Sequence, residues 1–181
     1  VKLACFGVEV LGALLVGVSE AKAIAYAKDL PLVGVHHIEG HVCANFIENK
    51  ELEPPFLCLI VSGGHTHLVI MKDYGEFEII GRTRDDAAGE AFDKVARLLG
   101  LGFPGGPEVE RLAEEAEEAI PFPVPLRGQE GYDFSFSGLK TKALHLVEKG
   151  LPKAALAKGF QEAAIAHLAE VVLKAAKDTG H

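Results

Sequence analysis

Two histidines four residues apart, His37 and His41, have the side chains and the spacing that suit metal binding. On a helix, residues at this spacing lie one turn apart on the same face, so two imidazoles can hold one ion. The stretch is not the HExxH pattern of zinc proteases, because Ile38 follows His37 and Glu39 comes one place later. Two ligands leave zinc or iron under-coordinated, so a third must come from elsewhere. The alternative is that one histidine caps a helix or hydrogen-bonds in the core.

A second candidate site is the glycine-rich turn Ser62-Gly63-Gly64, which separates two apolar runs over residues 56–61 and 68–71. We expect two strands joined by a tight turn. Because glycine has no side chain, such a turn can present backbone N–H groups and the serine hydroxyl to an anion. An ordinary hairpin turn is the alternative that so short a motif leaves open.

The helix expected over residues 87–99 carries the next candidate, Asp93. Asp85 and Asp86 stand where N-cap residues stand, and Gly100 stands where a helix ends on a glycine. Asp93 lies off the apolar stripe of this helix, on its open face. A carboxylate there either contacts a ligand or is simply solvated, and spacing alone does not decide between the two.

A further glycine turn, at residues 103–107, precedes another expected helix. Pro107 is predicted at the first helical position, and Gly106 leaves the helix N-terminus open to an anion. Glu110 follows one turn later and could face whatever occupies the turn. The acidic run that continues to residue 118 is otherwise typical of a solvated face.

Other elements must position these groups. A strand over residues 1–7, a helix over 11–28 and a strand over 32–36 predict a parallel strand pair with a right-handed crossover. Nearer the C-terminus, Ser137 is predicted to cap a helix, and residues 152–177 predict a core helix that covers a sheet.

A polar loop that ends in Pro54 and Pro55 is the expected lobe boundary. It gives residues 1–52 as the end of an N-terminal lobe with the histidine motif. Residues 53–181 then form the start of a second lobe with the glycine turns.

Composition narrows the function classes. A formal charge of −8 excludes a general basic field for nucleic acid, and only Lys140 and Lys142 form a compact basic spot. Three cysteines, Cys5, Cys43 and Cys58, lie far apart in apolar surroundings, which is typical of buried free thiols in a cytoplasmic protein. The longest apolar run is too short to span a bilayer.

Five motifs, in this order and at these spacings, resemble the TsaD family, the tRNA N6-adenosine threonylcarbamoyltransferases. An older name for this family is O-sialoglycoprotein endopeptidase, or glycoprotease. The motifs are VHHIEGH, VSGGHTHL, DDAAGEAFDKVARLLGL, FPGGP and DFSFSGLKT. They cover nearly the whole chain. The resemblance implies a metal site at the histidine pair. It also implies that the glycine turns and Asp93 belong to a nucleotide site.

The resemblance implies an α/β protein with the actin-like, sugar-kinase-like ATPase fold (ASKHA), here as an incomplete two-lobed domain with a nucleotide cleft. It implies transfer of the threonylcarbamoyl group from threonylcarbamoyl-AMP to N6 of adenosine 37 in tRNA, in t6A biosynthesis. It also implies one divalent metal ion, iron or zinc, and an adenylate, ATP or ADP in the cleft. The implied protein partners are a TsaB-like paralogue and a TsaE-like ATPase, in the cytoplasm.

Position by position, His37 and His41 match the metal-binding histidines of the family. The family's substrate and nucleotide contacts match Ile60, Val61, Ser62, Gly63, Gly64, Asp93, Gly106 and Glu110. At Glu110 the family usually has aspartate, and the longer side chain could still reach ribose hydroxyls. No serine needs to act as a nucleophile, because the attacking N6 amine needs positioning instead.

The chain departs from the family near its start, where Val8, Glu9 and Val10 follow Gly7 in place of Pro-Gly-Leu, and Ala23 replaces a glycine or similar small residue. The family continues on both sides, with a metal-binding aspartate among the further segments. We therefore expect a fragment, or a diverged and truncated copy, of an enzyme whose activity requires those segments. The alternatives are a metal-dependent O-sialoglycoprotein endopeptidase, against which the absence of HExxH stands, and a non-catalytic actin-fold partner, which is expected to lack the histidine pair.

Overall fold

A computed structural model describes the backbone of residues 11–180 and the side chains from residue 15 onwards. By their contacts these residues form two units, one that ends at Gly40 and one that begins at His41. The first unit holds helix α1 (Leu11–Ala27), which confirms the predicted helix, and an exposed irregular stretch over residues 30–36. Helix α2 (His37–Glu48) follows.

The strand predicted over residues 32–36 is wrong, since this stretch has no regular structure and all its residues are exposed. A strand needs a neighbour to satisfy its backbone N–H and C=O groups. The neighbour that the sequence suggested, residues 1–7, lies outside the described residues. The predicted parallel pair is therefore not formed by the described chain, whose sheet is antiparallel throughout.

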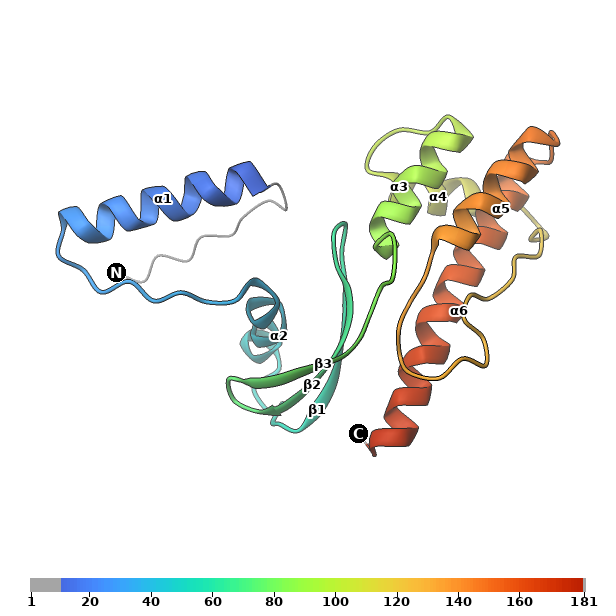
Figure 1. The fold of residues 1–181 in the computed structure, drawn as a ribbon. Coiled ribbons are helices and arrows are strands. Elements are labelled where there is room, and N and C mark those ends of the chain that lie inside the picture. The colour runs from blue at the N-terminus through green and yellow to red at the C-terminus, as the bar shows by residue number, and fades with distance from the viewer. Residues whose placement is uncertain (1–10, 181) are drawn as a thin grey trace. The chain divides into compact units, whose positions relative to one another are not determined.

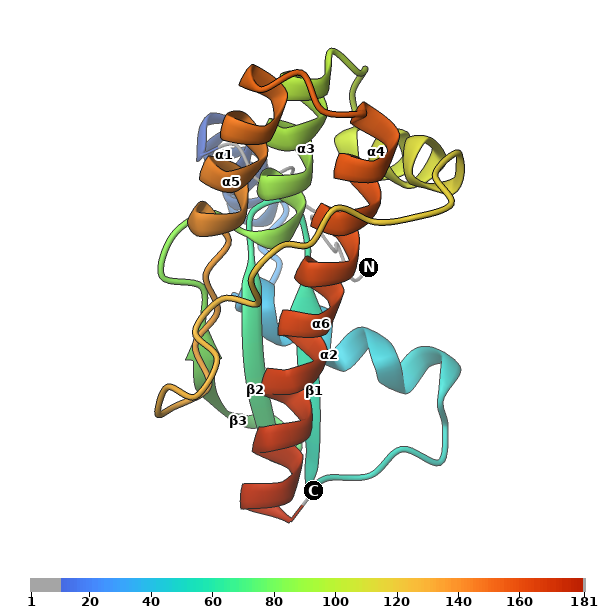
Figure 2. The ribbon, with the colours of Figure 1, turned by 90° about the vertical axis from the view of Figure 1, so that its right-hand side faces the viewer.

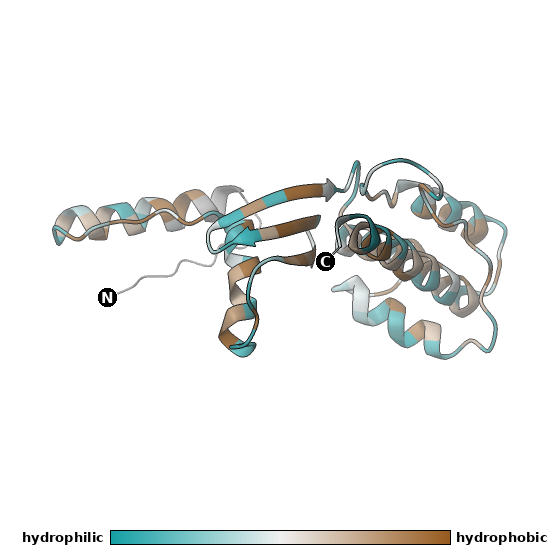
Figure 3. Cartoon of the chain, turned by 90° about the horizontal axis from the view of Figure 1, so that it is seen from below, coloured by the Kyte–Doolittle hydropathy of each residue, from teal (hydrophilic) through white to brown (hydrophobic). Residues whose placement is uncertain are grey.

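The sheet of the second unit has three strands in sequence order, as Figure 1 shows. They are β1 (Phe56–Val61), β2 (Thr66–Asp73) and β3 (Glu76–Arg82). Val61 lies opposite Thr66 and Phe56 opposite Met71, which confirms the predicted hairpin. Apolar and polar stretches follow one another along the strands (Figure 3). At the far end of the hairpin, the ring of Phe46 in α2 packs edge-on against Phe56 with centroids 5.8 Å apart.

Beyond α2, the helices of the second unit pack on one another. They are α3 (Ala88–Leu99), α4 (Gly105–Glu114), α5 (Ser137–Glu148) and α6 (Lys153–Thr179). Figure 2 shows α3 beside α5, and α6 running along this group. The buried residues that these helices share with β2 include Leu68, Val95, Leu139, Phe160 and Ala164.

The apolar face predicted for α6 is buried as expected, but its main contacts are with α3, α4 and α5. The prediction that it covers a sheet was wrong, because α4 and α5, which lie nearer in the chain than the strands do, offer it most of its apolar surface. Close approach depends on Gly159, where a Cβ atom would lie 1.8 Å from the Ile120 carbonyl oxygen. Within residues 11–180 no helix is both long and apolar enough to cross a membrane. The lobe boundary at residue 52 stays a prediction.

Candidate functional site

The glycine turn between β1 and β2 is shaped by the side chain of Ser62. The Ser62 N–H donates to the His65 carbonyl at 2.8 Å. In return, the Ser62 hydroxyl oxygen accepts the N–H of His65 at 3.0 Å and that of Gly64 at 3.4 Å. Gly63 and Gly64 remain exposed at the tip. The serine is thus a structural part of the turn, and the glycines form its accessible surface.

The two residues before the turn, Ile60 and Val61, complete β1. Ile60 is buried in the second unit, whereas Val61 is exposed. Alternate residues of a strand face opposite sides of a sheet, so only one of this pair can reach an open surface. Of these two predicted contacts, Val61 has the accessible side chain.

Helix α3 begins directly against the glycine turn. The Gly89 N–H donates to the Ser62 carbonyl at 3.2 Å. A Cβ atom at position 89 would lie 2.8 Å from the Ser62 carbonyl oxygen and 2.9 Å from Gly63 Cα, closer than any side-chain carbon normally comes. Glycine at this position is therefore required by the contact. Sequence reasoning missed Gly89, although a glycine inside a helical pattern was a signal for a close approach.

The prediction that Asp85 and Asp86 cap α3 is wrong. The N-cap position is Ala87, which offers no side-chain hydrogen bond. The Ala88 N–H donates instead to the hydroxyl of Thr66, at 2.9 Å in a buried position. Because Thr66 is the first residue of β2, the strand after the glycine turn supplies the cap of the helix that packs on that turn.

Asp85 instead caps α5. Its carboxylate accepts the N–H of Phe136 at 2.8 Å and that of Ser137 at 3.2 Å. The Ser137 hydroxyl, predicted to be the cap, donates to the same carboxylate at 2.9 Å, as does the hydroxyl of Ser135. Burial raises the pKa of Asp85, but these four hydrogen bonds outweigh it and hold the pKa below its ordinary value of 3.8.

Asp86 joins α3 to α5 through two lysines. One carboxylate oxygen lies 2.6 Å from Lys94 Nζ and the other 2.9 Å from Lys140 Nζ. Burial raises the pKa of Asp86, and the hydrogen bonds from both lysines lower it further than burial raises it. Lys140, half of the basic spot seen in the sequence, therefore neutralises a carboxylate of its own unit.

Asp93 fixes the start of α4. Its carboxylate accepts the Gly105 N–H at 2.6 Å, and a Cβ atom on Gly105 would lie 2.5 Å from Asp93 Cα. The helix begins at Gly105, with Pro104 at its N-cap position, so Pro107 is its third residue. The prediction of Pro107 at the first position was wrong by two residues, because the Asp93 carboxylate satisfies a backbone donor before the proline.

These contacts bring most of the predicted nucleotide residues into one strip. Gly89 and Asp93 are one turn apart on α3, the first against the glycine turn and the second against the start of α4. Gly106 and Glu110 are one turn apart on α4. A Cβ atom on Gly106 would meet nothing within 4 Å, and Glu110 is exposed, so this end of the strip is open.

A hollow of about 320 Å³ lies beside Asp93. Arg97 of α3 and Phe103 of the following loop also line it, and the ring of Phe103 is 84% exposed. Asp93 therefore lines an open hollow with polar and aromatic walls, in addition to binding the first residue of α4.

The predicted metal ligands His37 and His41 both lie in α2, one turn apart as expected, and both are exposed. Two imidazoles at this spacing fit two positions of a zinc or iron site. Among residues 11–180, no group of three or more histidine, cysteine or acidic side chains is arranged to hold a metal ion. A third ligand is thus not supplied by the described part of the chain.

The fold and the strip define a class of protein. It is an α/β protein that sets a glycine turn against the start of one helix and leaves Gly106 unobstructed at the start of a second, next to the residue that Asp93 binds. The family model described as "TsaD: tRNA N6-adenosine threonylcarbamoyltransferase" matches residues 10–181. The chain belongs to the TsaD family.

Curated relatives agree with this assignment, and each carries the name tRNA N6-adenosine threonylcarbamoyltransferase. A protein from Thermus thermophilus is 78% identical over 175 residues, covering 97% of this chain and 54% of the relative. The relative from Clostridioides difficile is 53% identical over 183 residues, which cover 97% of this chain and 54% of the relative. The relative from Clostridium kluyveri is 52% identical over 180 residues, which cover 95% of this chain and 53% of the relative. The chain spans about half the length of the relatives that it matches.

Proposed function

We propose that the full-length protein transfers the threonylcarbamoyl group from threonylcarbamoyl-AMP to N6 of adenosine 37 in tRNA. The names of relatives at 78% and 53% identity support this activity. The single structural observation that carries the proposal is the strip in which Gly89 and Asp93 join the glycine turn to the start of α4. In this proposal the adenylate lies along the strip.

Each residue of the strip has a separate role in this proposal. Exposed Gly63 and Gly64 let the phosphate approach the backbone of the turn. At the N-terminus of α4 the Asp93 carboxylate already accepts the Gly105 N–H, so the positive end of the helix dipole is offered to the nucleotide at Gly106. Gly106 leaves room for the nucleotide, and Glu110 reaches the ribose hydroxyls. Asp93 acts through Gly105, whose position it fixes, and through the hollow that it lines.

The reaction then needs little covalent chemistry from the protein. The attacking group is the N6 amine of the tRNA, and the leaving group is the AMP phosphate of the adenylate. Holding the two in register converts a bimolecular step into an effectively unimolecular one. Backbone N–H groups around the phosphate stabilise the charge that develops on it as it leaves.

In the proposed full-length fold, an ASKHA two-lobed domain, the described second unit contributes one wall of the nucleotide cleft. His37 and His41 would hold one iron or zinc ion together with a ligand from outside the described residues. When bound, such an ion polarises the carbamoyl carbonyl as a Lewis acid. The histidines themselves only hold the ion and fix its position.

We further propose that the protein acts in the cytoplasm with a TsaB-like paralogue and a TsaE-like ATPase. The chain has a formal charge of −8, so it offers no general field that attracts tRNA. Lys140 is held by Asp86. A partner surface that supplies positive charge is consistent with both observations.

The test is t6A formation on a tRNA transcript by the full-length protein with its partners, comparing Gly106→Ala with Gly138→Ala. A Cβ atom meets nothing within 4 Å at either position, so both variants should fold normally. Only Gly106 lies on the strip, so Gly106→Ala should raise the KM for the adenylate while Gly138→Ala stays at the wild-type value. No t6A from the wild type would refute the activity. Equal kinetics for the two variants would refute the placement of the nucleotide.

A further inference from the structure

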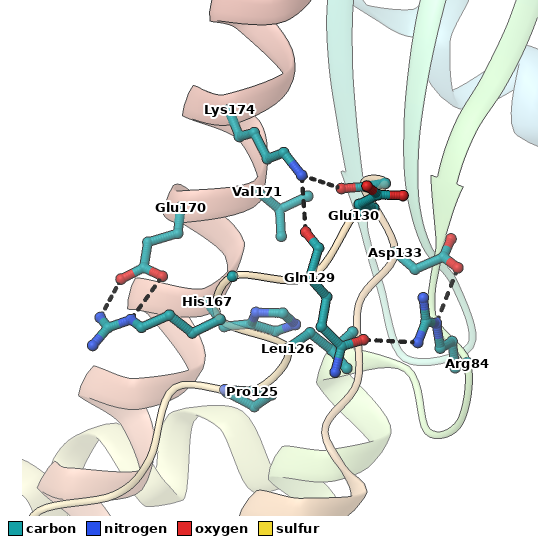
Figure 4. Close-up of a pocket in the computed structure, with 13 residues that line it drawn as sticks. Arg84, Pro125, Leu126, Gln129, Glu130, Asp133, His167, Glu170, Val171 and Lys174 are labelled. Carbon is teal, nitrogen blue, oxygen red and sulfur yellow. Dashed lines mark hydrogen bonds and ion pairs between the residues drawn. The ribbon is translucent and has the colours of Figure 1, made fainter.

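A second cavity, of about 290 Å³, lies between α6 and the loop over residues 125–131 (Figure 4). None of the residues predicted to bind metal or nucleotide lines it. Its size is at the lower end of the range for small-molecule sites. We call it the α6 pocket.

The deepest polar group of the α6 pocket is His167, whose side chain is only 1% exposed. The rings of Phe134 and Phe136 pack edge-on against it, with centroids 5.7 and 5.6 Å away. Burial lowers the pKa of His167, so its ring is neutral at pH 7, while Glu170 and Asp85 oppose the shift.

The tautomer of His167 follows from one hydrogen bond. Nε2 accepts the Ser135 N–H at 3.1 Å, so the proton of the neutral ring is on Nδ1. Nδ1 makes no hydrogen bond to the described residues, and the ring lines the pocket. It does not belong to the fully buried polar atoms that lack a partner, so it reaches the pocket, where a ligand atom or a water molecule can accept its hydrogen.

Most charges around the pocket are already paired. Arg84 Nε lies 3.1 Å from a carboxylate oxygen of Asp133, and Arg127 forms a two-pronged ion pair with Glu170. Figure 4 shows Glu170 on one side of the pocket and Arg84 with Asp133 on the other. These four residues contribute no net charge to a ligand.

One cation and one carboxylate of the lining have no ion pair among the described residues, although Lys174 Nζ also lies over the Tyr132 ring, 5.5 Å from its centroid. Lys174 Nζ donates to the neutral carbonyls of Gln129 and Gly131, at 2.9 and 3.0 Å, and has no carboxylate partner among the described residues. Glu130 has no ion pair within the described chain and is exposed at the rim. Both side chains line the pocket. The pocket therefore offers one positive charge, one negative charge and one neutral donor.

The loop that carries Glu130 is held in an unusual backbone conformation. Leu126 has φ of 52°, in the left-handed region that non-glycine residues rarely adopt. Such a residue costs on the order of 1 kcal/mol or more, and such strain gathers at binding sites. Arg127 and Lys174 hold the loop on α6 in this conformation.

We propose that the α6 pocket binds a small zwitterion, with a free α-amino acid as the ligand class. Its carboxylate accepts from His167 Nδ1–H and lies near Lys174, and its ammonium group faces Glu130. A polyanion such as RNA is disfavoured, because the lining has no net positive charge and Glu130 repels phosphate. The inference is independent of the proposed transferase activity.

The experiment is a calorimetric titration of the full-length protein with free amino acids, their N-acetyl derivatives, their amides and inorganic phosphate. In parallel, nitrogen NMR of histidine-labelled protein follows His167 Nδ1. We expect at least one free amino acid to bind and to shift the Nδ1 signal. Both blocked forms should bind about tenfold more weakly or worse, since each loses one charged hydrogen bond.

Two variants test whether the ammonium group of the ligand contacts Glu130, independently of any effect on folding. Glu130→Gln should weaken the binding of the free amino acid about tenfold, so that it binds no more tightly than the N-acetyl form. Glu162→Gln, an exposed α6 residue that does not line the pocket, is the matched control and should bind as the wild type does. Absence of binding by every compound, binding of phosphate alone, or equal affinity for free and blocked amino acids would each overturn the proposal.

Discussion

The Gly89 N–H at the start of α3 donates a 3.2 Å hydrogen bond to the Ser62 carbonyl of the glycine turn. Two motifs that are 27 residues apart in the sequence therefore meet at one backbone contact. Since Thr66, four residues after Ser62, also binds the Ala88 N–H, the turn and the helix are fixed to each other at two points. Changes at either point should affect the site and the stability together.

Gly89→Ala should destabilise the protein by about 1–3 kcal/mol, because its Cβ atom would overlap the backbone of the glycine turn, which cannot move aside as a flexible side chain can. Urea unfolding followed by circular dichroism measures this. Gly106→Ala is the control, expected within about 0.5 kcal/mol of wild type. Equal stability of the two variants would show that the turn does not rest on α3.

Thr66→Val should cost about 1–3 kcal/mol, since it keeps the shape of a buried side chain but leaves the Ala88 N–H without its acceptor. Thr141→Val removes an exposed hydroxyl whose bond to the Ser137 carbonyl is local, and it should change stability far less. Thermal unfolding of both variants gives the comparison. A loss for Thr141→Val as large as that for Thr66→Val would contradict this assignment.

Asp93→Ala should destabilise the start of α4 by about 0.5–2 kcal/mol, as the loss of a helix cap does. Asp93→Asn keeps an acceptor for the Gly105 N–H and should restore most of that stability. Hydrogen exchange of the Gly105 and Gly106 amides reports the effect locally. If the Asn variant exchanges as fast as the Ala variant, the carboxylate acts by its charge and not by this hydrogen bond.

The contribution of Asp85 to the stability of the folded protein should depend on pH. Its pKa in the folded protein lies below 3.8, so between these two values the native state binds fewer protons than the unfolded chain. The stabilisation is fully present above about 3.8 and is lost as pH falls through the folded pKa. Asp85→Ala should therefore differ most from wild type near neutral pH and converge with it in acid.

Urea unfolding between about pH 7 and about pH 2 measures the Asp85 effect, with Glu118→Ala as the control for removal of an exposed carboxylate from a loop. A gap between wild type and Asp85→Ala that stays constant over this whole range would mean that the carboxylate is not ionised when it caps α5.

Metal content of the full-length protein should fall on substitution of the histidine pair. His37→Ala or His41→Ala each removes one imidazole from a set in which two lie on one face of α2. Elemental analysis by mass spectrometry measures iron and zinc directly, without any activity assay. His145→Ala, an exposed histidine of α5, is the control. Unchanged metal content in both α2 variants would exclude this pair as ligands.

The sequence by itself determined much of the local structure. Apolar runs, helical apolar patterns and helix-end residues predicted β1, β2 and the helices α3, α4, α5 and α6 within a few residues, since these signals arise from neighbours along the chain. Gly100 was predicted to end α3 and does so with φ of 77°, a value that glycine adopts freely. The ordered motifs were also sufficient to identify the family.

Only the tertiary structure decided which side chain accepts the free backbone N–H groups at the start of each helix. Asp85 and Asp86 have the residue types of caps for α3, yet Asp85 caps α5, about 50 residues away, and Thr66 caps α3. Likewise, residues 32–36 have a strand pattern but no strand partner within the described chain. A cap or a strand pairing depends on a donor and an acceptor that meet in space. Residue type and spacing determine which hydrogen-bonding groups the chain contains. Long-range packing determines which of these groups bond to each other.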